Sequence, residues 1–141
     1  MLIPGVRMMR WKLALAALAG LAMTALAATA ADAAPGYTTA PARLRAGPGA
    51  DYPTVARLRP GVPVQIFGCL DGWAWCDIGV GHDRGWTDGH FLAADVQHRR
   101  RVIVEAAPVI GVPVITFDAG PYWDNYYRGR PWYHDRGRWV H

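Results

Sequence analysis

Residues 62–78 read VPVQIFGCLDGWAWCDI and contain both cysteines of the chain, Cys69 and Cys76. Two apolar runs flank the Asp71-Gly72 pair, which is typical of a tight turn between β-strands. Antiparallel strands joined by this turn place Cys69 opposite Cys76, at a separation that a disulfide can bridge. We therefore predict a β-hairpin that is closed by a disulfide.

The same spacing of short strands extends on both sides of the hairpin. Turn residues recur about every eight to twelve residues between residue 37 and residue 94, which favours a small all-β domain. We expect strands at residues 42–46, 54–58, 62–69, 73–78 and 85–87, with one helical turn at residues 88–93. Because positions two apart on a strand share a face, the hairpin register also predicts Phe67 opposite Ile78.

The first 33 residues have the pattern of a cleavable export signal. Three basic residues precede an uncharged apolar run at residues 13–27, which is too short for a comfortable membrane span. Residues 31–33 supply a small-x-small cleavage site, with residues 28–30 as a second option, and an uncleaved N-terminal anchor remains an alternative. We expect cleavage after Ala33, a periplasmic or secreted protein without a transmembrane anchor after cleavage, and an oxidising compartment.

The charge of the remaining chain is unevenly distributed along the sequence. Residues 34–98 contain 5 Arg and 6 Asp, whereas residues 99–141 contain 7 Arg and 4 acidic residues. Attraction to anionic partners is therefore expected to belong to the C-terminal tail.

The tail, residues 99–141, differs from the preceding part in composition as well. Glu105, Pro108, Gly111 and Pro113 are expected to prevent any helix, so we predict an extended, partly disordered tail with one segment pinned along a barrel edge. Aromatic residues and arginines alternate beyond residue 120 and suit stacking on flat faces and binding of anions. The predicted tail contacts with a ligand are Arg128, Arg130, Trp132, Arg136 and Arg138. The alternative is that these residues cover the barrel surface.

Four successive motifs resemble the bacterial Src-homology-3-like (SH3) domain. They are LRAGPGADYP at residues 44–53, LRPGV at 58–62, WCDI at 75–78 and GWT at 85–87. The resemblance covers residues 37–94 and implies a five-stranded β-barrel that, in exported proteins, binds cell-wall peptides or other proteins without catalysis. Thr87 departs from the family pattern, which more often has an apolar β-branched residue there.

Aromatic and acidic residues on the loops of this barrel are the candidate ligand contacts. Tyr52, Trp73 and Phe91 could line a shallow peptide groove, although packing is an equal alternative for Tyr52 and Trp73. Asp51 and Asp71 are interpreted first as turn residues whose side chains bond to nearby backbone N–H groups, and second as partners of a cationic peptide amine.

The residue inventory argues against catalysis and against a metal site. The chain has no Ser, and Glu105 is its only Glu, which removes a serine nucleophile and a paired-Glu mechanism. His82, His90 and His98 fall in separate loops with no zinc-ligand spacing, so no metal or cofactor is expected.

Three functions remain, in order of preference. The leading hypothesis is an exported, non-catalytic binding module of the cell envelope that recognises peptide, with cell-wall peptide as the main ligand. The alternatives are a periplasmic protein-protein adaptor and a small envelope enzyme that uses Asp and His. Export makes nucleic acid an unsuitable partner for all three.

Overall fold

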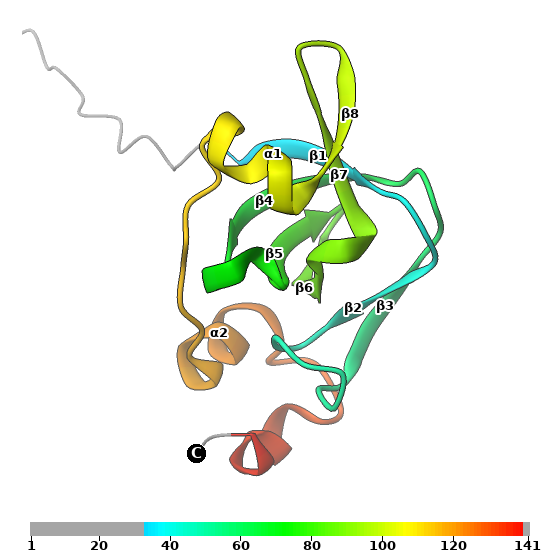
Figure 1. Cartoon of the computed structure of the whole chain (residues 1–141). Helices are drawn as coiled ribbons and strands as arrows, with labels where there is room; N and C mark the ends of the chain where they lie inside the picture. The colour runs from blue at the N-terminus through cyan, green and yellow to red at the C-terminus, as the bar shows by residue number, and fades with distance from the viewer. Residues whose placement is uncertain (1–32, 140–141) are drawn as a thin grey trace, which may run out of the picture.

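Eight antiparallel strands form one sheet, in the order β3-β2-β6-β5-β4-β1-β7-β8, in the computed structural model, which describes residues 33–139. The strands are β1 (Ala34–Thr38), β2 (Ala42–Arg45), β3 (Thr54–Leu58), β4 (Pro63–Cys69), β5 (Trp75–Val80), β6 (Asp83–Asp88), β7 (Leu92–Val96) and β8 (Arg99–Val102). Helix α1 and helix α2 lie on opposite sides of these strands (Figure 1). The predicted export signal lies, except for Ala33, outside the described residues.

The expectation of a five-stranded barrel is wrong, because β1, β7 and β8 bring the number of strands to eight and these strands form one open sheet. We use barrel below only as the name of residues 37–94. Strand β1 pairs with both β4 and β7 even though it contains Pro35 and Gly36. Gly36 is needed there, since a Cβ atom would lie 2.6 Å from the side chain of Ile66. The turn between β7 and β8 uses Gln97 and His98 at positive φ, so it lacks the glycine that would have indicated a hairpin. The helical turn expected near residue 90 is present as the 3-10 helix η2 (Gly89–Phe91).

The disulfide-closed hairpin is confirmed, with Cys69 paired with Cys76 between β4 and β5 and the two residues joined by a disulfide. A register shift between Ile66 and Gly68 places Ile66, not Phe67, opposite Ile78. The predicted pairing of Phe67 is therefore wrong. The bulge adds one residue to β4, so Ile66 enters the core and Phe67 remains half-buried on the outer surface.

Helix α1 (Ile103–Ile110) packs against β7 and β8 at one end of the sheet. Its buried residues Ile103, Ala106 and Ala107 pack toward β7, β8 and the 3-10 helices η1 (Asp71–Trp73) and η2. The expectation that no helix forms here is wrong, because burial of this apolar face outweighs the single backbone hydrogen bond that Pro108 removes. Gly111, at φ 77°, ends the helix and donates its N–H to the carbonyl of Ala107.

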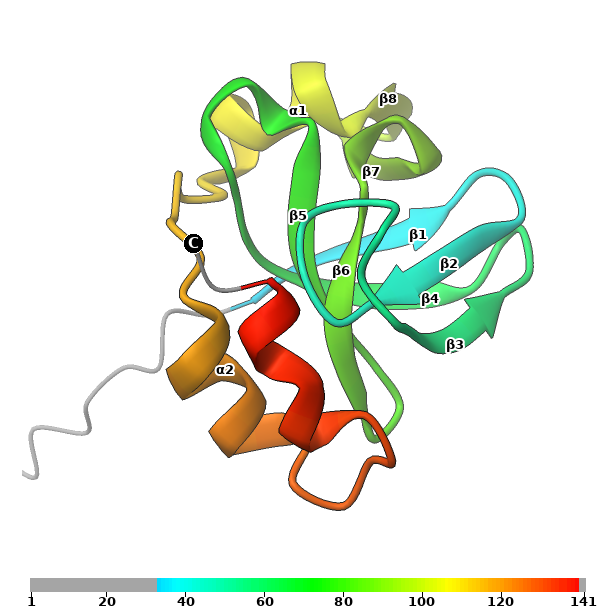
Figure 2. The ribbon, with the colours of Figure 1, turned by 90° about the horizontal axis from the view of Figure 1, so that it is seen from below.

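The tail after α1 is folded against the barrel, so the prediction of partial disorder is wrong. It contains α2 (Ala119–Tyr126) and the 3-10 helix η3 (Tyr133–Arg138), which lie side by side below β5 and β6 in Figure 2. Trp123 and Tyr127 are 0% and 2% exposed. The Trp123 indole N–H donates to the carbonyl of Ala46 over 2.8 Å, which fixes the tail to a barrel loop.

One extended segment of the tail is pinned to the sheet, but it lies at the end of the inner strand β4 and not along an edge strand as predicted. The Cys69 N–H donates to the Pro113 carbonyl over 3.0 Å, and the Ile115 N–H donates to the Cys69 carbonyl over 2.8 Å. The side chain of Ile115 lies directly over Gly68, where a Cβ atom would approach it to 2.6 Å. No helix within residues 33–139 is long and apolar enough to cross a membrane.

Candidate functional site

The outer face of β5 and β6 carries large and charged side chains that the tail partly covers. Trp86 is 1% exposed because Phe117 and Tyr122 of the tail pack against it, with ring centroids 5.4 Å and 6.0 Å away. Alternate residues of a strand share a face, so Arg84 lies on the same side of β6 as Trp86. Asp77, which pairs with Trp86 across β5 and β6, completes this face.

Arg84 and Asp77 form a bidentate ion pair on this face. The Arg84 Nε and Nη2 atoms lie 2.7 Å and 2.8 Å from the two carboxylate oxygens of Asp77. The Tyr122 hydroxyl donates to the same carboxylate over 2.7 Å. Burial lowers the pKa of the Arg84 guanidinium, but hydrogen bonds and charge from Asp77 more than offset this and raise it overall. Burial, followed by the negative charge of Asp77, raises the pKa of Tyr122.

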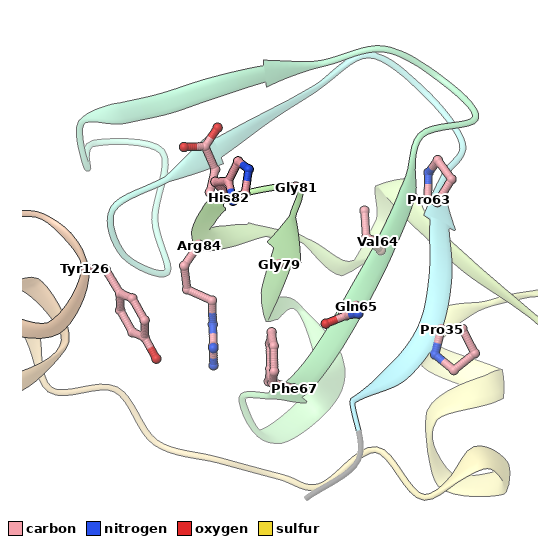
Figure 3. A pocket seen from close by; sticks show the side chains of 11 residues that line it. Pro35, Pro63, Val64, Gln65, Phe67, Gly79, Gly81, His82, Arg84 and Tyr126 are labelled. Carbon is pink, nitrogen blue, oxygen red and sulfur yellow. The ribbon is translucent and has the colours of Figure 1, made fainter. Parts of the chain in front are cut away.

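The Arg84 guanidinium is also held between two aromatic rings, one from the sheet and one from the tail. Its carbon lies 3.4 Å from the ring centroid of Phe67 and 5.0 Å from that of Tyr126 (Figure 3). The backbone carbonyl of Arg84 accepts a 2.7 Å hydrogen bond from the Tyr127 hydroxyl. The Arg84 guanidinium is therefore held in place by its contacts and is not a free cation.

A groove of about 620 Å³ opens beside the Arg84 side chain, and we call it the Arg84 groove. Its apolar and aromatic lining comes from Pro35, Pro63, Val64, Phe67 and Tyr126. Gln65, His82 and Asp83 supply its polar groups together with Arg84. Apolar and aromatic walls with a few hydrogen-bonding side chains are typical of ligand-binding pockets.

A second groove of about 270 Å³ lies at the other end of the same strands, and we call it the Trp75 groove. Trp75 and Phe91 form its aromatic part, and Arg43 and Arg45 border it. Asp88 also lines it, but this carboxylate accepts a 2.9 Å hydrogen bond from the His90 N–H and lies 2.7 Å from the His90 ring nitrogen.

The structure places the predicted barrel contacts in different surroundings. Tyr52 packs against the tail, with ring centroids 5.6 Å from Phe117 and 5.9 Å from Trp139, and burial raises its pKa. Trp73 is half-buried at a small pocket of about 90 Å³ on the α1 side. Phe91, 37% exposed, is the only one of these three aromatics in the Trp75 groove.

The two predicted acidic contacts are also separated from one another. Asp51 is exposed in the loop after β2, and Asp71 is exposed at the start of η1. Neither Asp51 nor Asp71 lines the Arg84 groove or the Trp75 groove.

Several of the predicted tail contacts are occupied within the fold. Arg130 lies 3.3 Å from the Asp83 carboxylate. The Arg128 Nε donates to the backbone carbonyl of Asp124 over 2.8 Å. Trp132 is half-buried against Trp123, with ring centroids 4.9 Å apart. Arg138 is exposed at the end of η3.

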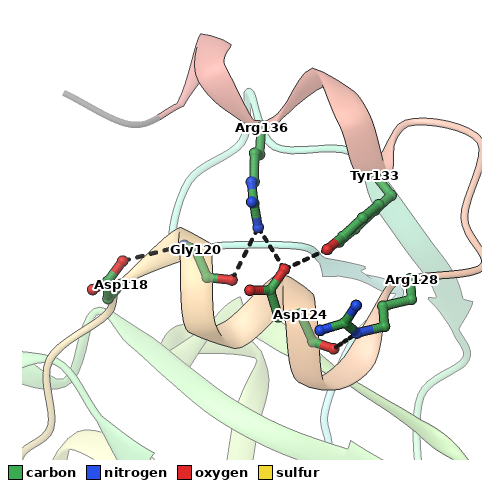
Figure 4. Close-up of polar contacts among 6 residues, drawn as sticks. All are labelled: Asp118, Gly120, Asp124, Arg128, Tyr133 and Arg136. Atoms are coloured by element: carbon green, nitrogen blue, oxygen red, sulfur yellow. Dashed lines mark hydrogen bonds and ion pairs between the residues drawn. The ribbon is translucent and has the colours of Figure 1, made fainter.

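Asp124 joins α2 to η3. Its carboxylate lies 2.5 Å from the Arg136 guanidinium and accepts a hydrogen bond from the Tyr133 hydroxyl (Figure 4). The hydrogen bond from Tyr133, together with the hydrogen bond and positive charge of Arg136, lowers the pKa of Asp124. Asp118 accepts a 3.2 Å hydrogen bond from the Gly120 N–H and caps the start of α2.

Sequence reasoning did not identify Phe67, Arg84 or Tyr126 as site residues. Regular strand alternation does not predict that Phe67 faces outward, and the one signal of the bulge in the sequence is Gly68, an isolated glycine inside the strand pattern. Tyr126 is brought to Arg84 by the folding of the tail. Within the described part of the chain, no group of three or more His, Cys, Asp or Glu side chains is placed to hold a metal ion.

Comparison with protein families matches residues 40–93 to the bacterial SH3 domain. No curated protein and no solved structure matches the chain. The resemblance carried by the four sequence motifs is thereby confirmed over these residues, which run from just before β2 into β7.

Proposed function

We propose that this chain, whose residues 40–93 match the bacterial SH3 domain, is an exported, non-catalytic binding module of the cell envelope that recognises cell-wall peptide. The match supports a binding role, and the disulfide is compatible with a periplasmic or extracellular location. The domain organisation that follows is an export signal at residues 1–33, a barrel at residues 37–94, and a C-terminal part at residues 99–141.

The observation that carries the proposal is the Arg84 groove. The tail covers Trp86 in the middle of the sheet face but leaves about 620 Å³ open beside Phe67, Arg84 and Tyr126. Prolines and aromatic rings supply contact area at low entropic cost, and Gln65 can pair with a peptide backbone. The contribution of the C-terminal part is to build one wall of this groove through Tyr126.

Retention of the full chain on purified cell-wall sacculi tests the proposal. The double variant Gln65→Ala with Tyr126→Ala should bind about three- to tenfold more weakly, because each aromatic contact contributes about 0.5–1.5 kcal/mol. A matched control is Val104→Ala with Val109→Ala, since both valines are exposed on α1 and line neither groove. Absence of retention of the wild-type chain would contradict wall binding and favour the adaptor alternative.

A further inference from the structure

Two arginines face each other directly on the β2–β3 ribbon. Arg43 pairs with Arg57 in the antiparallel register, and both are exposed. Side chains directly opposite on one face of such a pair are close neighbours, and like charges in these positions repel. None of the ion pairs that the structure shows within residues 33–139 includes either arginine.

The charge around these two arginines is mainly positive. Residues 42–59 contain 4 Arg and 1 Asp. Arg45 donates to the Tyr52 carbonyl over 3.1 Å, and Asp88 is engaged by His90 at 2.7 Å and 2.9 Å. The positive charge of the barrel is therefore concentrated on one ribbon, although the barrel sequence as a whole is nearly neutral.

This ribbon borders the Trp75 groove. Arg43 lines that groove and also a neighbouring pocket of about 260 Å³ that includes Arg57, so the two depressions meet at Arg43. Trp75 and Phe91 also line the Trp75 groove and supply its aromatic part. A ligand in this groove would therefore meet both guanidinium groups and aromatic side chains.

We propose that the Trp75 groove is a second subsite that takes a peptide with a free carboxylate, which Arg43 and Arg57 bind while a neighbouring apolar side chain lies against Trp75 and Phe91. Guanidinium groups match carboxylates in charge and in hydrogen-bond geometry. A phosphate polymer would satisfy the arginines but has no apolar group for the aromatic wall. The proposal rests on the proposed function only for the source of the peptide.

The test is an NMR titration of the full chain with acetyl-Ala-Leu-Ala carrying a free C-terminal carboxylate, with its C-terminal amide, and with inorganic phosphate. The free acid should shift the amide signals of Arg43 and Arg57 and the indole signal of Trp75. The amide should bind about tenfold more weakly, because charge-assisted hydrogen bonds are lost. Equal binding of acid and amide, or no shift with either, would overturn the proposal. Phosphate binding as tight as that of the acid, without a shift at Trp75, would also overturn it.

Two double variants distinguish specific binding at this site from non-specific attraction between opposite charges. Arg43→Gln with Arg57→Gln should lose the acid-over-amide preference. Arg99→Gln with Arg101→Gln removes the same charge from β8, at the other end of the strand order, and should keep the preference. Equal losses in the two variants would refute a specific site. A wild-type chain that fails to bind sacculi but titrates with the acid would refute the proposed function and leave this subsite standing.

Discussion

Arg84 connects the barrel to the tail through its side chain, so its replacement should be costly. Arg84→Met leaves the Asp77 carboxylate, whose side chain is 7% exposed, without its cation. We expect the free energy of unfolding to fall by about 3–5 kcal/mol, because an unpaired buried charge is strongly unfavourable. Urea unfolding followed by tryptophan fluorescence measures this change.

The exposed Arg59 provides the control for that experiment, because it takes part in no ion pair shown within residues 33–139. Arg59→Met should unfold at nearly the wild-type urea concentration. An Arg84→Met protein as stable as the wild type would show that the pair contributes nothing to the fold.

Removing one of the opposed arginines should have the opposite effect on stability. Arg57→Gln relieves the repulsion from Arg43, and we expect a gain of about 0.2–1 kcal/mol in the free energy of unfolding. Thermal unfolding at low salt measures it, and the gain should shrink at high salt as the repulsion is screened. A loss of stability would indicate that Arg57 makes a favourable contact.

At the scale of single elements, the disulfide should stabilise the β4–β5 hairpin without being required for the fold. Replacing Cys69 and Cys76 by Ala removes a short covalent loop, and the chain-entropy model predicts a loss of about 2–3 kcal/mol. Ile66 and Ile78 remain buried in the core, so cooperative unfolding should persist at a lower temperature. Mass spectrometry with and without reductant checks the bond itself, and fully reactive thiols in the native protein would contradict it.

The contact between η3 and α2 should weaken at acid pH. The pKa of Asp124 is lowered from the ordinary value of 3.8, so the ionised carboxylate favours the folded state. This stabilisation is complete when the pH is above the ordinary pKa of 3.8, and it is lost as the pH falls through the lowered pKa of the folded state. Asp124→Asn should therefore melt below the wild type at pH 7, and the difference should close as the pH falls below the ordinary pKa of 3.8 and through the lowered pKa.

The exposed Asp135 serves as the control for this pH dependence, since none of the ion pairs seen in residues 33–139 involves it. Asp135→Asn should follow the wild-type melting curve at every pH. A difference between Asp124→Asn and the wild type that does not change with pH would mean that charge at Asp124 is not the cause.

At the scale of the whole molecule, the tail belongs to the folded body. Truncation after Val112 removes Trp123 and Tyr127 and exposes Trp86, so we expect loss of fixed tertiary structure. Near-ultraviolet circular dichroism and NMR signal dispersion should both collapse. The full chain with Arg128→Ala and Arg138→Ala, both exposed, should keep the native spectra. A truncated chain with native spectra would show that the barrel folds without its tail.

The folded structure also changes how the distribution of charge along the sequence is interpreted. The sequence assigns the positive excess to the tail, yet Arg130 and Arg136 are paired with Asp83 and Asp124. Arg43 and Arg57, which belong to none of the ion pairs shown within residues 33–139, face each other on the barrel. Counts along a chain do not record which charges fold together, because these partners lie 47 and 12 residues apart.

The β4–β5 hairpin, its disulfide and the resemblance of residues 40–93 to the bacterial SH3 domain could all be predicted from the sequence alone. Each of these depends on turn residues and strand alternation, which act between neighbours in the chain. Three features became visible only in the folded molecule: Phe67 faces outward, a helix forms around Pro108, and the tail builds one wall of a groove. These features depend on packing between distant segments, and the gain from burying apolar surface there overrides local preference.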